Sequence, residues 1–124
     1  MTTKDSCVRH STFVQEAKEI AQQLGFTWET EGYTETIKTP ATTYRIERVN
    51  EHQHVWGDGG HSLYQSRLFR EDTPAVCLLE TKNWASWGTY CDDSEDYETG
   101  REQNTTLHIE DEFALAIFSR ICPR

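Results

Sequence analysis

The sequence predicts a single α+β domain in which an N-terminal amphipathic helix and a C-terminal buried helix pack on a mostly antiparallel sheet of about five or six strands. Three observations support this fold class. The chain has one helical apolar period near its start, a middle region rich in Thr, Tyr, Trp, Val and Ile, and an almost wholly apolar stretch near its end. Its 124 residues fit one domain with one core, so we treat residues 1–124 as a single unit.

The first predicted element is an amphipathic helix that begins at Thr12. Thr12 and Gln15 match a T-x-x-Q capping box, and Gly25 suits the left-handed position that follows many helices. The side chains on its expected buried face are Phe13, Ala17, Ile20, Ala21 and Leu24.

Turn residues divide the middle of the chain into candidate strands. The expected strands are 26–30, 33–38, 42–55, 61–69, 75–81 and 84–90, with a short last one at 105–109. Residues 56–60 contain three glycines and should form a hairpin loop. Because successive strands are joined by short turns, we expect antiparallel pairing.

The last third of the chain contains an acidic segment and an apolar helix. Residues 91–100 are polar and aperiodic, so we expect a loop there. Asp111 should cap a final helix over 112–121, which is apolar nearly all round. A helix of that kind is buried against the sheet or against another subunit, which leaves a homodimer open.

The charge of the chain narrows the choice of partners. Its 21 acidic and 12 basic residues give a formal net charge of −9, whereas nucleic-acid binding depends on Lys and Arg. We therefore expect no direct binding of DNA or RNA, and an acidic surface favours a basic protein partner. No segment is apolar enough to span a bilayer, and residues 1–11 lack the apolar core of a signal peptide. Four scattered cysteines without a CxxC motif then indicate reduced thiols and a cytoplasmic location.

A histidine-rich hairpin is the main candidate for a metal site. His52 and His54 are two residues apart, so they share one face of a strand. If Val55 lies opposite Gly60, His54 faces His61 and three imidazoles converge, as in a three-histidine Zn²⁺ or Fe²⁺ site. A register shift by one residue would separate His61 from the other two, and no carboxylate offers a fourth ligand. Ordinary hydrogen-bonded histidines without any cofactor are therefore the favoured interpretation.

The acidic segment is the main candidate for a partner-binding site. Negative side chains interleaved with tyrosine could attract a basic groove and anchor in it. The alternative is a solvated loop that only keeps the protein soluble. The candidate residues are Asp92, Asp93, Glu95, Asp96, Tyr97 and Glu98.

These features favour a non-catalytic interaction protein over an enzyme. Cys77 lies in an apolar run, Cys91 is followed by two aspartates, and the adjacency of His61 and Ser62 in the sequence does not build a catalytic triad. The preferred hypothesis is an acidic inhibitor or immunity-type protein that mimics nucleic acid and occupies the basic surface of a defence nuclease or toxin. One alternative is a small metal-binding domain or metal-dependent enzyme that uses the histidine hairpin. The other is a small-molecule-binding α+β domain with a tryptophan-lined pocket between the sheet and a helix.

Overall fold

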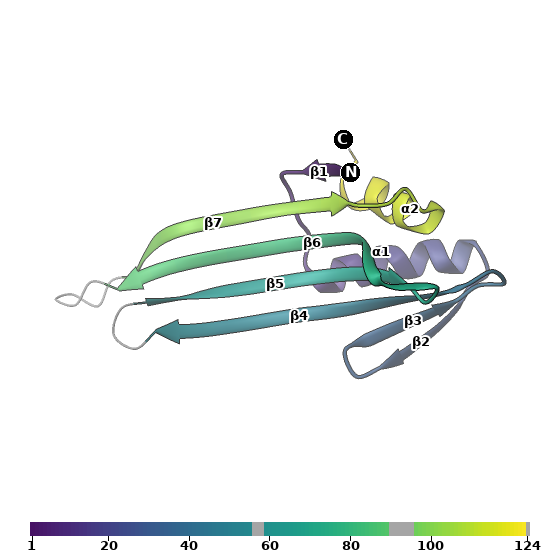
Figure 1. Cartoon of the computed structure of the whole chain (residues 1–124), viewed down its shortest axis with the longest axis horizontal. Helices are drawn as coiled ribbons and strands as arrows, with labels where there is room; N and C mark the ends of the chain where they lie inside the picture. Colours follow the sequence, from purple (N-terminus) through teal and green to yellow (C-terminus); the bar gives the residue numbers. More distant parts are fainter. Residues whose placement is uncertain (56–58, 90–95, 124) are drawn as a thin grey trace.

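One seven-stranded antiparallel sheet forms most of the protein, and two helices cover part of it (Figure 1). The computed structural model describes residues 1–55, 59–89 and 96–123, without the side chains of 54, 55, 89 and 96–99. The elements in chain order are β1 (Thr2–Lys4), α1 (His10–Gln23), β2 (Thr27–Glu31), β3 (Thr34–Lys38), β4 (Thr43–Val55), β5 (Gly59–Arg70), β6 (Thr73–Thr89), β7 (Asp96–Leu107) and α2 (Glu112–Ile121). The strand order is β1-β7-β6-β5-β4-β3-β2, so the sheet is a meander that β1 closes at one edge.

The predicted fold class was wrong in two respects. The chain starts with strand β1, not with a helix, and the sheet has seven strands. β1 is short and polar, and only its pairing with β7, from Thr2 opposite Leu107 to Lys4 opposite Thr105, makes it a strand. A three-residue polar segment has no alternation of apolar and polar residues from which a strand could be predicted, since its strand conformation depends on pairing with the distant strand β7.

Two expected breaks in the sheet are also absent. The separate strands 75–81 and 84–90 form the single 17-residue strand β6. β7 begins at Asp96, so residues 96–100, which we expected in a loop, pair with β6 instead. Long ladders on both sides of β6 supply backbone hydrogen bonds that outweigh the weak strand propensity of these polar residues.

Helix α1 begins three residues earlier than the capping box predicted. Its N-cap residue is Arg9, which makes no side-chain cap hydrogen bond. The buried face is as predicted except for Leu24, which is half exposed. The end is a Schellman motif with Gly25 at φ 75°, in which Phe26 N donates to Ala21 O at 2.8 Å.

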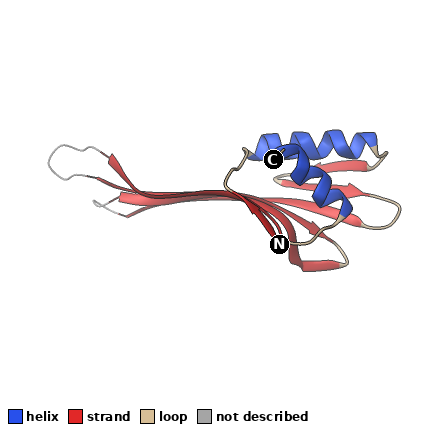
Figure 2. Cartoon of the chain, turned by 90° about the horizontal axis from the view of Figure 1, so that it is seen from above, coloured by secondary structure: helices blue, strands red, loops and turns tan. Residues whose placement is uncertain are grey.

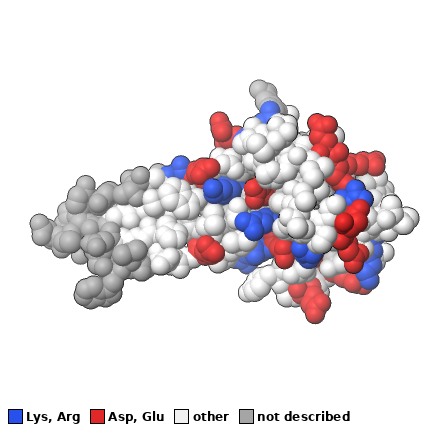
Figure 3. Space-filling view, in the orientation of Figure 1, with Lys and Arg blue, Asp and Glu red and all other residues white. Residues whose placement is uncertain are grey.

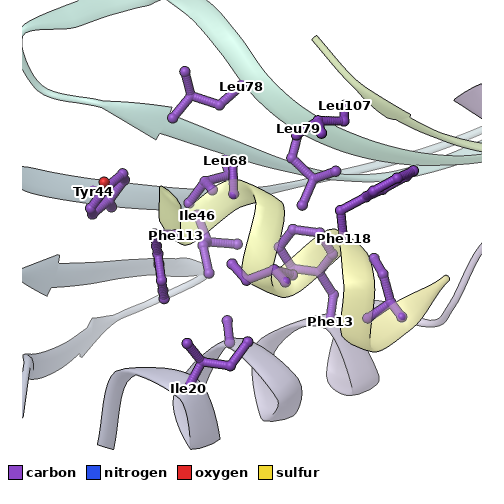
Figure 4. Packing of buried hydrophobic residues seen from close by; sticks show 14 of the residues in the cluster. Phe13, Ile20, Tyr44, Ile46, Leu68, Leu78, Leu79, Leu107, Phe113 and Phe118 are labelled. Carbon is purple, nitrogen blue, oxygen red and sulfur yellow. The ribbon is translucent and has the colours of Figure 1, made fainter. Parts of the chain in front are cut away.

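Helix α2 has the predicted bounds and the predicted cap. Asp111 Oδ1 accepts hydrogen bonds from Phe113 N at 3.0 Å and Ala114 N at 3.2 Å. One face of the helix is buried within its own chain, whereas Leu115 is 43% exposed, which the sequence did not predict. Phe113 packs on the ring of Tyr44 (Figure 4) and on the ring of Phe26. Within the described chain no helix is both long and apolar enough to cross a membrane.

Both helices lie on the same face of the sheet, which we call the helix face (Figure 2). Tyr44, Ile46, Leu68 and Leu79 point from this face into the core. The opposite, open face carries ion pairs such as Arg67 with Glu80 at 3.6 Å and Lys82 with Glu102 at 3.3 Å. One apolar and one charged face explain the alternating pattern of the strands.

The central strands continue well beyond the helices. Figure 2 shows this extension, which we call the arm and define as residues 49–55, 59–65, 82–89 and 96–104. Among the described side chains on the face shown in Figure 3, charged ones gather mainly over the helix-bearing half. The core therefore occupies one half of the sheet, and the arm projects from it with no helix over either face.

Asp111 joins helix α2 to the sheet, because Tyr44 Oη and Arg70 Nη1 each donate to its carboxylate at 2.9 Å. Replacing Asp111 by Ala removes the cap and leaves a buried hydroxyl without its acceptor, so we expect the free energy of unfolding to fall by about 3 kcal/mol. Urea denaturation measures this change. The control is Asp72→Ala, which removes the exposed partner of the same arginine and should cost less than about 1 kcal/mol. Equal losses in the two variants would contradict the structural role of Asp111.

Candidate functional site

The histidines of the β4–β5 hairpin do not converge in the register that we expected. From Tyr44 opposite Arg70 to Val55 opposite Gly59 the ladder has one uninterrupted register, and it pairs His61 with Gln53 and His54 with Gly60. His61 therefore lies on the open face, whereas His52 lies on the helix face. The whole long ladder sets this register, so the glycines of the turn do not decide it.

His52 takes part in an aromatic contact. Its ring stacks on Trp87 with centroids 5.3 Å apart and an interplanar angle of 25°. Among the side chains that the structure describes, no three His, Cys, Asp or Glu residues are grouped so that they could hold a metal ion. The side chain of His54 lies outside the described residues, so the metal site stays a prediction that lacks its expected geometry.

The acidic segment lies mostly outside the described residues, which include neither Asp92, Asp93 nor Glu95. The backbone of Asp96, Tyr97 and Glu98 belongs to β7 and pairs with the end of β6. That end of the hairpin is the one farthest from the helices (Figure 1). The role of these six residues in partner binding stays a prediction.

A different site appears where the helices end and the arm begins. Successive rows of side chains cross the helix face, and the row of Ile46, Leu68, Leu79 and Leu107 is fully apolar and buried. Polar residues replace these side chains in the next two rows. The first consists of Arg48, Ser66, Thr81 and Thr105, and the second of Asn50, Tyr64, Asn83 and Gln103. Ser66, Thr81 and Thr105 are still buried, whereas Arg48 and the whole second row are partly or fully exposed, so the packed layer ends between these two rows.

A cavity of about 650 Å³ lies over these polar rows, and we call it the α1 pocket. Its floor comes from β4, β5, β6 and β7, and its other wall comes from the segment that leads into α1. The lining residues are Cys7, Val8, Arg9, His10, Ser11, Arg48, Val49, Tyr64, Gln65, Ser66, Thr81, Asn83 and Gln103. The described tryptophans, Trp28, Trp84 and Trp87, are not among them, so the pocket differs from the tryptophan-lined one that we expected.

His10 is fixed at the start of α1 by a hydrogen bond to the sheet. Its Nδ1 lies 2.7 Å from Ser66 Oγ, which is the one hydrogen bond of this ring to the part of the chain that the structure describes. Burial lowers the pKa of His10 below its ordinary value, and the charge of Arg48 lowers this pKa further, whereas Glu35 acts in the opposite direction. The imidazole is therefore mainly neutral at pH 7, with Nε2 available to another group.

Arg48 stands beside His10 without a carboxylate partner. Its guanidinium lies over the ring of Tyr33 at 5.2 Å, and within the described part of the chain it forms no ion pair. Stacking uses the face of the guanidinium and leaves the N–H groups on its edge free to donate. Glu35, the nearest acidic influence on His10, already accepts from Trp28 Nε1 at 3.0 Å and from Thr30 Oγ1.

The α1 pocket is therefore electropositive within an acidic protein. Its lining includes Arg9, Arg48 and His10 and contains no Asp or Glu. Two side chains of the lining could in principle act as nucleophiles, Cys7 and Ser66. Burial, together with the charge of Cys122, raises the pKa of the Cys7 thiol, and Ser66 is buried in the sheet. The arrangement suits binding better than nucleophilic catalysis.

Sequence reasoning missed this site because its residues are far apart in the chain. The available signal was the change along β4 from inward-facing Tyr44 and Ile46 to inward-facing Arg48. A charged residue that continues an apolar alternation marks the place where a core ends.

Comparisons with known proteins give no further information, since no family model, no curated protein and no solved structure matches this chain. Any function must therefore be argued from the site itself.

The burial of His10 and its proximity to Arg48 lead to a testable prediction about the pKa of its ring. In the wild-type protein the His10 ring should titrate below 6.5, and Arg48→Gln should raise this pKa because it removes a neighbouring positive charge. Because the unfolded chain binds this proton more readily than the native chain, His10 should also lower the free energy of unfolding as the pH falls below about 6.5.

NMR titration of the histidine ring protons measures this pKa directly. Arg67→Gln is the matched control, since Arg67 lies on the open face in an ion pair with Glu80. A His10 pKa at or above the ordinary value, or an equal shift in both variants, would contradict the described electrostatics.

Proposed function

We propose that this protein is a small-molecule-binding α+β domain and that the α1 pocket is its binding site. The observation that carries the proposal is the cavity of about 650 Å³ at the boundary between core and arm. Ligand pockets in proteins are typically about 300–1,000 Å³ in volume and carry a few polar groups among apolar ones.

The walls of the pocket support binding of a specific molecule. They come from four strands and from the segment before α1, so one ligand would contact parts of the chain that are distant in sequence. Val8 and Tyr64 offer apolar surface, while His10 and Asn83 offer hydrogen-bonding groups. The hydrogen bond between His10 and Ser66 fixes one wall in advance, which reduces the entropy lost on binding.

The proposal is tested by blocking the pocket. Asn83 lies on its floor, so Asn83→Trp should fill the cavity, whereas Lys82→Trp places the same ring on the open face. We expect at least one member of a library of neutral, cationic and anionic fragments to shift the backbone amide signals of residues 8–11 and 64–66. Asn83→Trp should abolish these shifts and Lys82→Trp should preserve them.

Proton–nitrogen NMR spectra of the labelled protein provide the readout, and thermal unfolding of each variant shows that it is folded. The proposal fails if no fragment perturbs the pocket amides of the wild-type protein. It also fails if the folded Asn83→Trp variant binds the same fragments as strongly as the wild type does.

A further inference from the structure

The charges around the α1 pocket indicate which class of molecule it takes, an inference that rests on the proposed function. We propose that the ligand is a small amphipathic organic anion, whose carboxylate or phosphate group binds between Arg48 and His10 while its apolar part lies against Tyr64. Each part of this arrangement follows from a separate observation.

The first observation is the charge of the pocket in relation to the rest of the protein. The chain has 21 acidic residues and 12 basic ones, yet the lining of the α1 pocket includes two arginines and a histidine and no acid. A cation would meet only repulsion there, and a neutral molecule would leave the arginine charges unused. An anion is the class that this lining complements.

The second observation is the state of Arg48. Other arginines on the sheet are paired, as Arg45 is with Glu47 and Arg70 is with Asp111. Among the described side chains, the aromatic ring of Tyr33 lies beneath Arg48 and no acid pairs with it, so the guanidinium is restrained without being neutralised. A restrained and unpaired guanidinium can form two parallel hydrogen bonds to a carboxylate or phosphate.

The third observation concerns the proton on His10. When Ser66 Oγ donates to Nδ1, the neutral imidazole carries its proton on Nε2, and this N–H can donate to an anion. The bound anion would favour that tautomer. His10 therefore supplies a second donor beside Arg48 without adding a full positive charge.

The apolar part of the ligand has its own contact surface. Tyr64 lies in the second polar row, on the same side of the sheet as the helices, and is 44 % exposed, so its ring is accessible to a ligand. Val8 also lines the cavity. A bound ring or short alkyl chain would cover this apolar surface.

The test compares an acid with its neutral amide. Benzoate and benzamide have nearly the same shape and differ in charge, and inorganic phosphate serves as an anion without an apolar part. We expect benzoate to shift the amide signals of residues 8–11 and 64–66 and to bind at least about tenfold more tightly than benzamide. Phosphate should perturb the same residues more weakly, since it makes no contact with Tyr64.

Arginine variants show which charge makes the pocket prefer benzoate to benzamide, and a Tyr64 variant tests the apolar contact. Arg48→Gln should remove the preference for benzoate over benzamide, and the control Arg67→Gln should keep it, although both substitutions change the net charge equally. Tyr64→Ala should weaken benzoate binding and leave phosphate binding unchanged.

Equal affinities for benzoate and benzamide, absent shifts with both anions, or equal effects of the two arginine variants would each overturn the inference. A pocket that binds neutral fragments but ignores benzoate and phosphate would still satisfy the proposed function. A pocket that binds no fragment at all would end both proposals.

Discussion

The structure depends on a mismatch in length between its helices and its central strands. The 14 residues of α1 span about 21 Å, whereas the 17 residues of β6 span about 56 Å. Two short helices can therefore bury only part of the helix face, and the remaining strand residues must form an arm. The residues follow this constraint, since inward-facing side chains are leucine and isoleucine beneath the helices and polar beyond them. The α1 pocket lies where the covered part of the sheet ends.

Polar contacts fix the two ends of the helical layer in different ways. At one end, Asp111 caps α2 and accepts from Tyr44 and Arg70, which makes a buried and fully used carboxylate. At the other end, His10 at the start of α1 bonds to Ser66 and leaves Arg48 unpaired beside it. The first arrangement satisfies its charges internally and stabilises the fold. The second leaves Arg48 without an acidic partner among the described residues, which is why we propose a binding site there.

Sequence patterns within a short segment were sufficient to predict the two helices. The apolar period gave most of the buried face of α1, and Asp111 followed by an apolar run gave the exact bounds of α2. Non-local features could not be predicted in the same way. β1 exists only through β7, the register of β4 with β5 comes from the whole ladder, and His61 lies opposite Gln53 for that reason. The pocket required knowing which distant strands bring Arg48, Ser66 and His10 together, and no spacing within the sequence contains that information.

We have proposed that the α1 pocket, at the end of the core of this acidic protein, binds an organic anion. A crystal structure of the protein with para-bromobenzoate tests this claim most directly, because the anomalous signal of bromine fixes the direction of the ligand. We expect the carboxylate oxygens within hydrogen-bonding distance of Arg48 and the bromine beside Tyr64. A ligand bound with its carboxylate toward solvent, or an α1 pocket without ordered bromine at saturating concentration, would contradict the claim.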